Sequence, residues 1–303
     1  MNQSIGTLFC IAIFCCSQLS FAQDIAEHVP NNNFSYPGGV ALLKLPKTSN
    51  SLPSVRYGLK EPAILDQGSH WLVLLGIGLD QLPGEYVVYT RQTGESESAQ
   101  FKKFEVIHKN YPLESSESAQ RKDIAKIDAL SELDFSNTQP PKLPMQLPFE
   151  AQWDEQFGKL TVSNKDADSL VQNHSSARAA TNTLVKAPQQ GIISNIIDAP
   201  KGAIGNTKVL VIDHGRGIYS LLHGVTDLAV EIGNHVVTGA VVAKVPAPGG
   251  TRSGAGRASV TGISPKQRLN RDNRNANTDM ARVFWQVQLN DVLVNPLILT
   301  KLQ

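Results

Sequence analysis

The chain has 303 residues, with 28 Lys and Arg against 27 Asp and Glu, so its formal net charge is +1 at pH 7. This balance lacks the strong excess of positive charge that typifies nucleic-acid-binding domains, and we expect no nucleic-acid partner. The length exceeds that of a typical single domain and is sufficient to bury two hydrophobic cores.

The first 22 residues contain no Lys, Arg, Asp or Glu, hold an apolar run at 8–16, and end in Ser20-Phe21-Ala22. This pattern predicts a secretory signal peptide over residues 1–22 that is cleaved before Gln23. An uncleaved anchor is the alternative, but the apolar run is short for a bilayer, so we expect no membrane span after cleavage. All three cysteines lie in this segment, and the predicted mature chain therefore contains no disulfide or thiolate metal site.

Between residues 38 and 109 the sequence alternates short β-rich runs with turn residues, of which Pro83-Gly84 is the clearest turn. Five or six such strands predict a small antiparallel β-sandwich, which we assign to residues 23–111. His70 and His108 each stand alone in this region, so we expect both to be structural or exposed rather than catalytic.

The next segment, residues 112–150, is predicted to connect two domains. Apolar residues recur every three positions between Ser115 and Leu133 among charged ones, which predicts an amphipathic helix. Four prolines then exclude regular structure and predict a stiff, extended linker over Asn137–Pro148. The second domain is expected to cover residues 151–303.

The second domain centres on a strand, a Gly-flanked turn and a second strand over Val209–Leu222, followed by His223. Three further segments accompany this hairpin at set distances: Leu184–Ser194, Val230–Val245 and Phe284–Leu299. In this order the four segments resemble the lysostaphin/LytM-type zinc metallopeptidases, a family with the duplicated hybrid motif that cuts peptide bridges in bacterial cell wall.

The resemblance implies an antiparallel β-sheet domain at 151–303, so the whole chain is predicted to be all-β. The N-terminal pattern that begins at Pro37-Gly38-Gly39 also resembles the accessory domain of one secreted branch of the family. We therefore expect a location outside the cytoplasm, in the periplasm or cell envelope.

The resemblance also implies a zinc site built from three side chains, and most of them are replaced here. In the family, a histidine and an aspartate four residues apart bind zinc, and the second histidine of a His-apolar-His motif completes the set. The first motif corresponds to His174–Arg178, so His174 remains as a vestigial ligand and Arg178 stands at the aspartate position. The second falls on Arg282-Val283-Phe284, where both histidines are lost.

Two further family histidines orient the attacking water, and only His223 remains of them, as a catalytic remnant. One histidine ligand cannot hold zinc at catalytic affinity, so a complete site and a cofactor are not expected. Two guanidinium groups near the former metal position would favour anions instead. We therefore predict a binding groove formed by Arg178, Arg282, Phe284, Trp285 and His223. Alternatively, both arginines point into solvent or pair with nearby carboxylates.

Two other features bear on this site. A metal site could have been rebuilt from Asp213, His214, His223 and His235. The loop at 246–280 is much longer than the family turn and carries an excess of four positive charges. It is either a tolerated insertion or a basic flap that recruits acidic partners.

These observations favour a secreted, catalytically inactive metallopeptidase homologue that binds peptidoglycan or regulates a cell-wall hydrolase. Degenerate LytM-type domains that activate cell-wall amidases are the family precedent, which makes peptidoglycan or an amidase the expected partner. One alternative is an active zinc metalloendopeptidase that cuts peptidoglycan cross-links with a non-standard ligand set. Another is a purely structural envelope protein in which the fold is a relic. The sequence does not name the partner, the bond or the oligomeric state.

Overall fold

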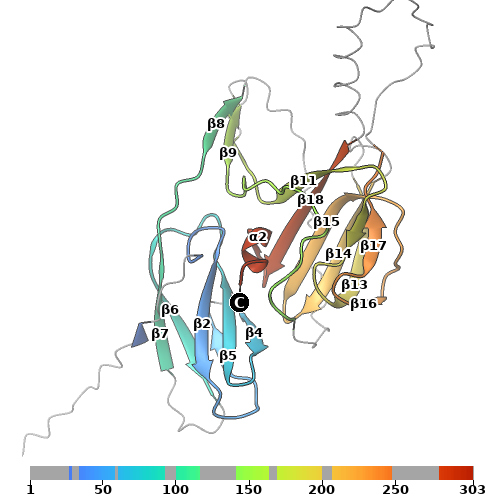
Figure 1. Cartoon of the computed structure of the whole chain (residues 1–303). Coiled ribbons are helices and arrows are strands. Elements are labelled where there is room, and N and C mark those ends of the chain that lie inside the picture. Colours follow the sequence, from blue (N-terminus) through green and yellow to red (C-terminus); the bar gives the residue numbers. More distant parts are fainter. Residues whose placement is uncertain are drawn as a thin grey trace, which may run out of the picture.

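The structure is a computed structural model, and it describes residues 27–28, 34–58, 61–92, 100–116, 141–163, 169–199, 207–247 and 280–302. The predicted signal peptide, nearly all of the predicted amphipathic helix and most of the basic loop at 246–280 lie outside the described residues. Strands dominate the described part, which confirms the all-β prediction (Figure 1).

The N-terminal part forms the predicted β-sandwich. One sheet has the order β2-β5-β4, built from β2 (Val40–Pro46), β5 (His70–Gly76) and β4 (Ala63–Asp66). The other has the order β1-β7-β6-β3 and contains β1 (Glu27–His28), β7 (Gln100–Val106), β6 (Gly84–Arg91) and β3 (Ser54–Arg56). All pairings are antiparallel except that of β1 with β7, which is parallel.

The sheet β2-β5-β4 is buried on both faces. Leu43 and Val73 point into the sandwich core, whereas Leu72 and Leu74 belong to the core of the C-terminal part. Two-sided burial explains why β5 reads as a continuous apolar run instead of the alternation typical of a half-exposed strand. Contact is close enough that a Cβ at Gly76 would lie 3.1 Å from the Cβ of Val292.

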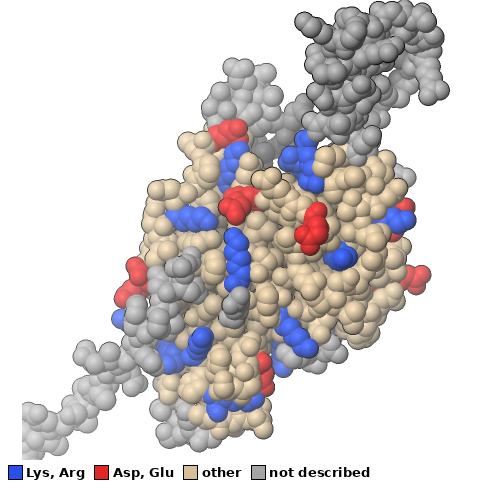
Figure 2. Space-filling view, viewed as in Figure 1, with Lys and Arg blue, Asp and Glu red and all other residues tan. Residues whose placement is uncertain are grey.

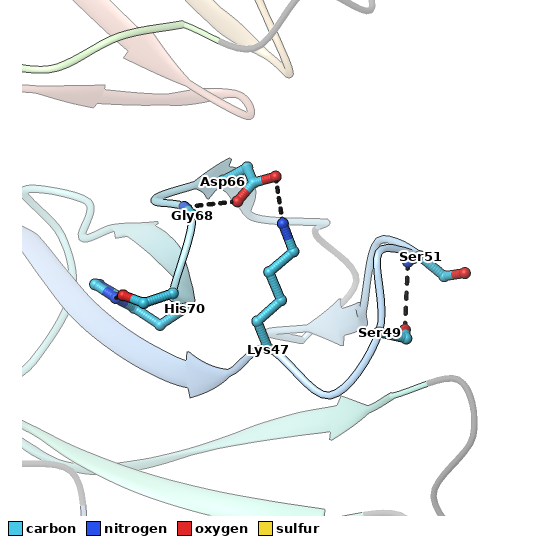
Figure 3. Close-up of polar contacts among 7 residues, drawn as sticks. Lys47, Ser49, Ser51, Asp66, Gly68 and His70 are labelled. Atoms are coloured by element: carbon cyan, nitrogen blue, oxygen red, sulfur yellow. Dashed lines mark hydrogen bonds and ion pairs between the residues drawn. The ribbon is translucent and has the colours of Figure 1, made fainter.

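An ion pair holds the solvent-exposed rim of this sandwich. The Lys47 Nζ lies 2.7 Å from Asp66 Oδ2, and the other carboxylate oxygen accepts the Gly68 N–H in the turn before β5 (Figure 3). His70 follows this turn and its Nδ1 lies 3.1 Å from Ser69 Oγ, while His108 is exposed. Within the described residues, neither histidine belongs to a group of three or more His, Cys, Asp or Glu side chains that could hold a metal ion.

The C-terminal part is built on one seven-stranded antiparallel sheet with the order β11-β18-β15-β14-β13-β16, in which β19 also pairs with β18. Its strands are β11 (Ser175–Ala180), β18 (Met280–Leu289), β15 (Ile218–Val225), β14 (Lys208–Gly215), β13 (Gly191–Asp198), β16 (His235–Val236) and β19 (Val292–Val294). The hairpin expected at 209–222 is β14 and β15. A two-stranded ribbon of β12 (Leu184–Lys186) and β17 (Val241–Lys244) completes this part.

The connecting segment differs from its prediction. Ser115 and Ser116 belong to β8 (Leu113–Ser116), which pairs in parallel with β9 (Leu160–Ser163), itself antiparallel to β10 (Ser169–Val171). The expected helix therefore does not begin at Ser115.

Residues 141–148 contain no helix or strand, as the prolines predict, but they do not form an extended spacer. Met145 and Phe149 are buried in the core of the large sheet, and the Met145 N–H donates to Leu299 O at 2.9 Å.

A short helix, α2 (Pro296–Leu299), lies between the sandwich and the large sheet (Figure 1). Asn295 caps it by accepting the Leu297 N–H, and the Asn295 N–H donates to Gly38 O across the junction at 2.8 Å. In the described part of the chain, no helix is long and apolar enough to cross a membrane.

Candidate functional site

The residues expected at the former zinc centre lie on three neighbouring strands, β11, β18 and β15, except His174, which directly precedes β11 (Figure 1). Strand pairing places Arg178 opposite Arg282, and His223 opposite Phe284. Because side chains alternate between the two faces of a strand, Arg282, Phe284 and His223 share one face of the sheet. The structure thus brings the predicted positions together at the edge formed by β11.

His174 lies in the bend just before β11 and contacts Phe284. The two ring centroids are 5.1 Å apart with an interplanar angle of 88°, an edge-to-face arrangement. Burial lowers the pKa of His174 to about 4, Asp154 opposes this shift, and Arg282 adds to it. His174 is therefore a neutral imidazole at physiological pH, packed against an aromatic ring.

His223 is buried on β15 and belongs to a hydrogen-bonded chain of polar side chains. Its Nε2 lies 2.7 Å from Gln286 Oε1, and because an amide oxygen only accepts, Nε2 carries the proton. The Gln286 Nε2 in turn donates to Asn173 Oδ1 at 2.9 Å. Burial lowers the pKa of His223 to about 4 against the raising effect of Gln286, and the nearby His174 lowers it further.

Arg178 and Arg282 line a groove of about 580 Å³ that runs beside β11. Segment 150–154 forms its opposite wall, and Glu150 and Asp154 line the groove with the two arginines. Asp154 is fixed in place because its Oδ1 accepts the Ser176 N–H at 2.9 Å and its Oδ2 accepts the Ser176 hydroxyl. Two carboxylates thus offset the two guanidinium groups, and the groove is of mixed charge instead of purely cationic.

The expectation that Trp285 lines the groove is wrong. Trp285 is 0% exposed and points to the opposite face of the sheet, where its ring lies 5.9 Å from that of Trp153. Its Nε1 donates to Ser220 Oγ at 3.2 Å. The period of two along β18 places Phe284 and Trp285 on opposite faces, so Phe284 shares the face of Arg282. Of the five predicted residues, however, only Arg178 and Arg282 line the groove, and Phe284 and His223 do not.

The residues considered for a rebuilt metal site do not assemble one. His214 is buried with its Nδ1 2.8 Å from Gln190 O and its Nε2 2.8 Å from Ser220 Oγ, so both ring nitrogens have partners. His235 is exposed on β16, away from this network. Within the described residues, no group of three or more His, Cys, Asp or Glu side chains could hold a metal ion.

Zinc, the metal implied by the resemblance, does not fit the residues now at its position. His174 offers a nitrogen, but Phe284 has no donor atom and its ring contacts His174. Arg178 and Arg282 are permanent cations, and neither can act as a ligand. This donor set does not match the three-ligand site that a catalytic zinc requires.

Four residues of the site were not identified from the sequence: Asn173, Gln286, Glu150 and Asp154. Gln286 was within reach of sequence reasoning, because it lies two residues after Phe284 and so shares its face of β18. No sequence pattern indicated Glu150 and Asp154, because segment 150–154 is distant from β11 in the sequence and contacts it only in the folded chain.

The chain matches no family model and no curated protein. Among solved structures, it resembles a Pseudomonas aeruginosa protein provisionally assigned to peptidase M23, with 22% identity, a TM-score of 0.58, and coverage of 88% of this chain and 95% of that one. This similarity shows that the fold is that of M23 peptidases, the lysostaphin-type fold expected from the sequence.

Two other structures are more distant. The catalytic domain of lysostaphin from Staphylococcus simulans is 13% identical with a TM-score of 0.33, over 50% of this chain and 93% of that one. A zinc-containing peptidase from Vibrio cholerae is 11% identical with a TM-score of 0.37, over 82% and 85%. At these scores neither supports an argument about function.

Proposed function

We propose that this chain is a catalytically inactive metallopeptidase homologue of the bacterial cell envelope, which binds peptidoglycan or regulates a cell-wall hydrolase. One observation supports this most directly: Phe284, which stands where the resemblance implies a zinc ligand, packs edge-to-face on His174. The Phe284 ring offers no donor atom to a metal, while the surrounding sheet keeps the fold of M23 peptidases.

The remaining polar groups favour binding over hydrolysis. His223 uses its Nε2 proton in the bond to Gln286, which is itself held by Asn173. A hydrolytic centre needs a bound, activated water with an open coordination position. Here the histidine that would orient such a water is tied into a network of amide side chains.

The test combines metal content, peptidase activity and wall binding of the purified chain. After exposure to zinc and removal of free metal, we expect much less than one zinc per chain and no clearing of a peptidoglycan gel. We expect the chain to bind insoluble sacculi or a purified cell-wall amidase. Stoichiometric zinc together with clearing that a chelator abolishes would instead establish the active peptidase.

A pair of variants connects binding to the site. Phe284→Ala removes the ring that contacts His174 and is expected to weaken the binding at least threefold. Leu82→Ala removes an exposed apolar side chain, 73% accessible, from a turn of the sandwich and serves as the matched control. Equal binding by both variants would contradict a role in binding for the contact between Phe284 and His174.

A further inference from the structure

The outer face of the sheet β1-β7-β6-β3 carries a pair of aromatic side chains in contact with solvent. Tyr89 on β6 lies opposite Phe101 on β7, and the two ring centroids are 5.8 Å apart at an interplanar angle of 71°. Phe101 is 42% exposed, and Val87, which shares this face, is 48% exposed. The intervening Val88 points the other way, into the sandwich core. Val87, Tyr89 and Phe101 thus form an aromatic patch that the core does not use.

Two arginines flank the aromatic patch on the same face. Arg56 on β3 lies opposite Tyr89, and Arg91 follows Tyr89 by two residues along β6. Both arginines are exposed, and within the described residues neither takes part in an ion pair. Side chains opposite each other start from Cβ atoms about 5 Å apart, and residues two apart on a strand are separated by about 7 Å. One small ligand can therefore contact an aromatic ring and a guanidinium group together.

The other end of this face is acidic. Glu85 on β6 lies opposite Glu105 on β7, and the Lys103 Nζ is 3.6 Å from Glu85 Oε2. A ligand with closely spaced negative charges, such as a nucleic acid, would be repelled at this end. Figure 2 likewise shows acidic and basic side chains interspersed over the visible face rather than gathered into one basic area. The arrangement favours an anion of low charge density that also carries apolar surface.

A carbohydrate with occasional carboxylates has both properties. The face of an aromatic ring is electron-rich, so the C–H groups of a pyranose ring, which carry a small positive charge, pack against it. A guanidinium group presents paired N–H donors that match the two oxygens of a carboxylate. Because the rings of Tyr89 and Phe101 meet at 71°, they form a corner that suits a single sugar chain better than a flat crystalline surface.

We propose that the outer face of this sheet binds an acidic glycan, with a sugar ring on the aromatic patch and a carboxylate held by Arg56 and Arg91. This face belongs to the N-terminal sandwich and shares no residue with the groove beside β11. The glycan site therefore goes beyond the proposed function and does not depend on whether the groove binds or cuts.

Two tetrasaccharides test the sugar and the charge by calorimetric titration of the full chain at low salt. One is a hyaluronan fragment, which alternates N-acetylglucosamine with glucuronic acid, and the other is the neutral N-acetylglucosamine oligomer. We expect the hyaluronan fragment to bind at least about threefold more tightly, and higher salt should reduce this difference. Equal affinity for the two sugars, or no binding of the hyaluronan fragment at about 10 mM, would overturn the proposal. Tighter binding of a single-stranded oligothymidylate would also overturn it.

Variants assign each contribution to a side chain, and thermal unfolding verifies that each variant is folded. Phe101→Leu keeps an apolar residue on β7 but removes the ring, and it should weaken binding of both sugars by about fivefold or more. Arg56→Gln combined with Arg91→Gln should abolish the preference for the acidic sugar. Lys44→Gln, at an exposed position on β2 in the other sheet, is the matched control and should change neither affinity. A folded Phe101→Leu chain with wild-type affinity, or a double arginine variant with the full preference, would refute the site.

These results are distinguishable from those that test the proposed function. Phe284→Ala, which alters the contact with His174, should leave the affinity for both tetrasaccharides unchanged, and a loss there would overturn the glycan site. A zinc-free chain that binds sacculi but neither sugar would support the proposed function and refute the glycan site. Zinc-dependent peptidase activity with intact sugar binding would refute the inactive assignment and support the glycan site.

Discussion

Acid should destabilise this protein through two fully buried histidines. Burial lowers the pKa values of His214 and His223 from 6.5 to about 4. In the unfolded chain each imidazole takes up a proton near pH 6.5, whereas in the folded chain it stays neutral until about pH 4. The unfolded state therefore binds more protons in this window, and stability falls as the pH drops from 6.5 towards 4.

The size of the effect follows from the two pKa values. At ~1.4 kcal/mol per pKa unit, each histidine costs up to ~3 kcal/mol once the pH lies below 4. At pH 5 the cost is about 2 kcal/mol for each, or about 4 kcal/mol for both. This loss is a large fraction of the free energy of unfolding of a typical folded domain, which is about 5–15 kcal/mol. The difference in stability between the two pH values should therefore be measurable.

Guanidinium unfolding followed by tryptophan fluorescence at pH 7.5 and pH 5 measures the loss. His214→Gln and His223→Gln should each reduce the difference between the two pH values by about 2 kcal/mol, whatever their stability at pH 7.5. His108→Gln, at an exposed position, is the control. If the two buried variants lose as much stability as the wild type between these pH values, the assignment of the acid sensitivity to these imidazoles is refuted.

Three further predictions address the site and the junction. Arg282→Ala should raise the pKa of His174, because Arg282 lowers it, and an NMR titration of the imidazole that shows no rise would contradict this. Trp285→Phe removes the indole N–H that donates to Ser220 Oγ, so it should lower the free energy of unfolding by about 1–3 kcal/mol and leave binding to sacculi unchanged. Weakened binding would contradict the placement of Trp285 away from the groove. Gly76→Val should destabilise by about 1–3 kcal/mol in thermal unfolding, because its Cβ would lie 3.1 Å from that of Val292, and wild-type stability would refute this contact.

Much of the fold could be predicted because its signals are local. The hairpin of β14 and β15 follows from two apolar runs that flank a turn, and Arg216 and Gly217 adopt positive φ there. The sandwich follows in the same way from short runs and turn residues. What local patterns could not indicate is which face each strand buries when both faces are covered, as in β5.

The errors at the site have different physical origins. Trp285 was predicted to line the groove because it directly follows Arg282-Val283-Phe284. Side chains alternate along a strand, however, so neighbouring Phe284 and Trp285 must point to opposite faces of the sheet. Glu150 and Asp154 could not be found, because the irregular segment 150–154 that carries them gives no periodicity that would indicate its partner. Their charges matter nonetheless, since they convert a groove that we expected to be cationic into one of mixed charge.

The arrangement of the two parts has a consequence for how the groove works. Leu72 and Leu74 of the sandwich share a core with Val292 and Leu289 beside the large sheet. Separating the two parts would return these four side chains to water at roughly 1.5–3 kcal/mol each, or about 6–12 kcal/mol in total. A cost of that size makes the junction a permanent contact rather than a hinge. We therefore expect β18, which packs against β5 at one end and carries Arg282 at the other, to present a groove that is already formed before any ligand binds.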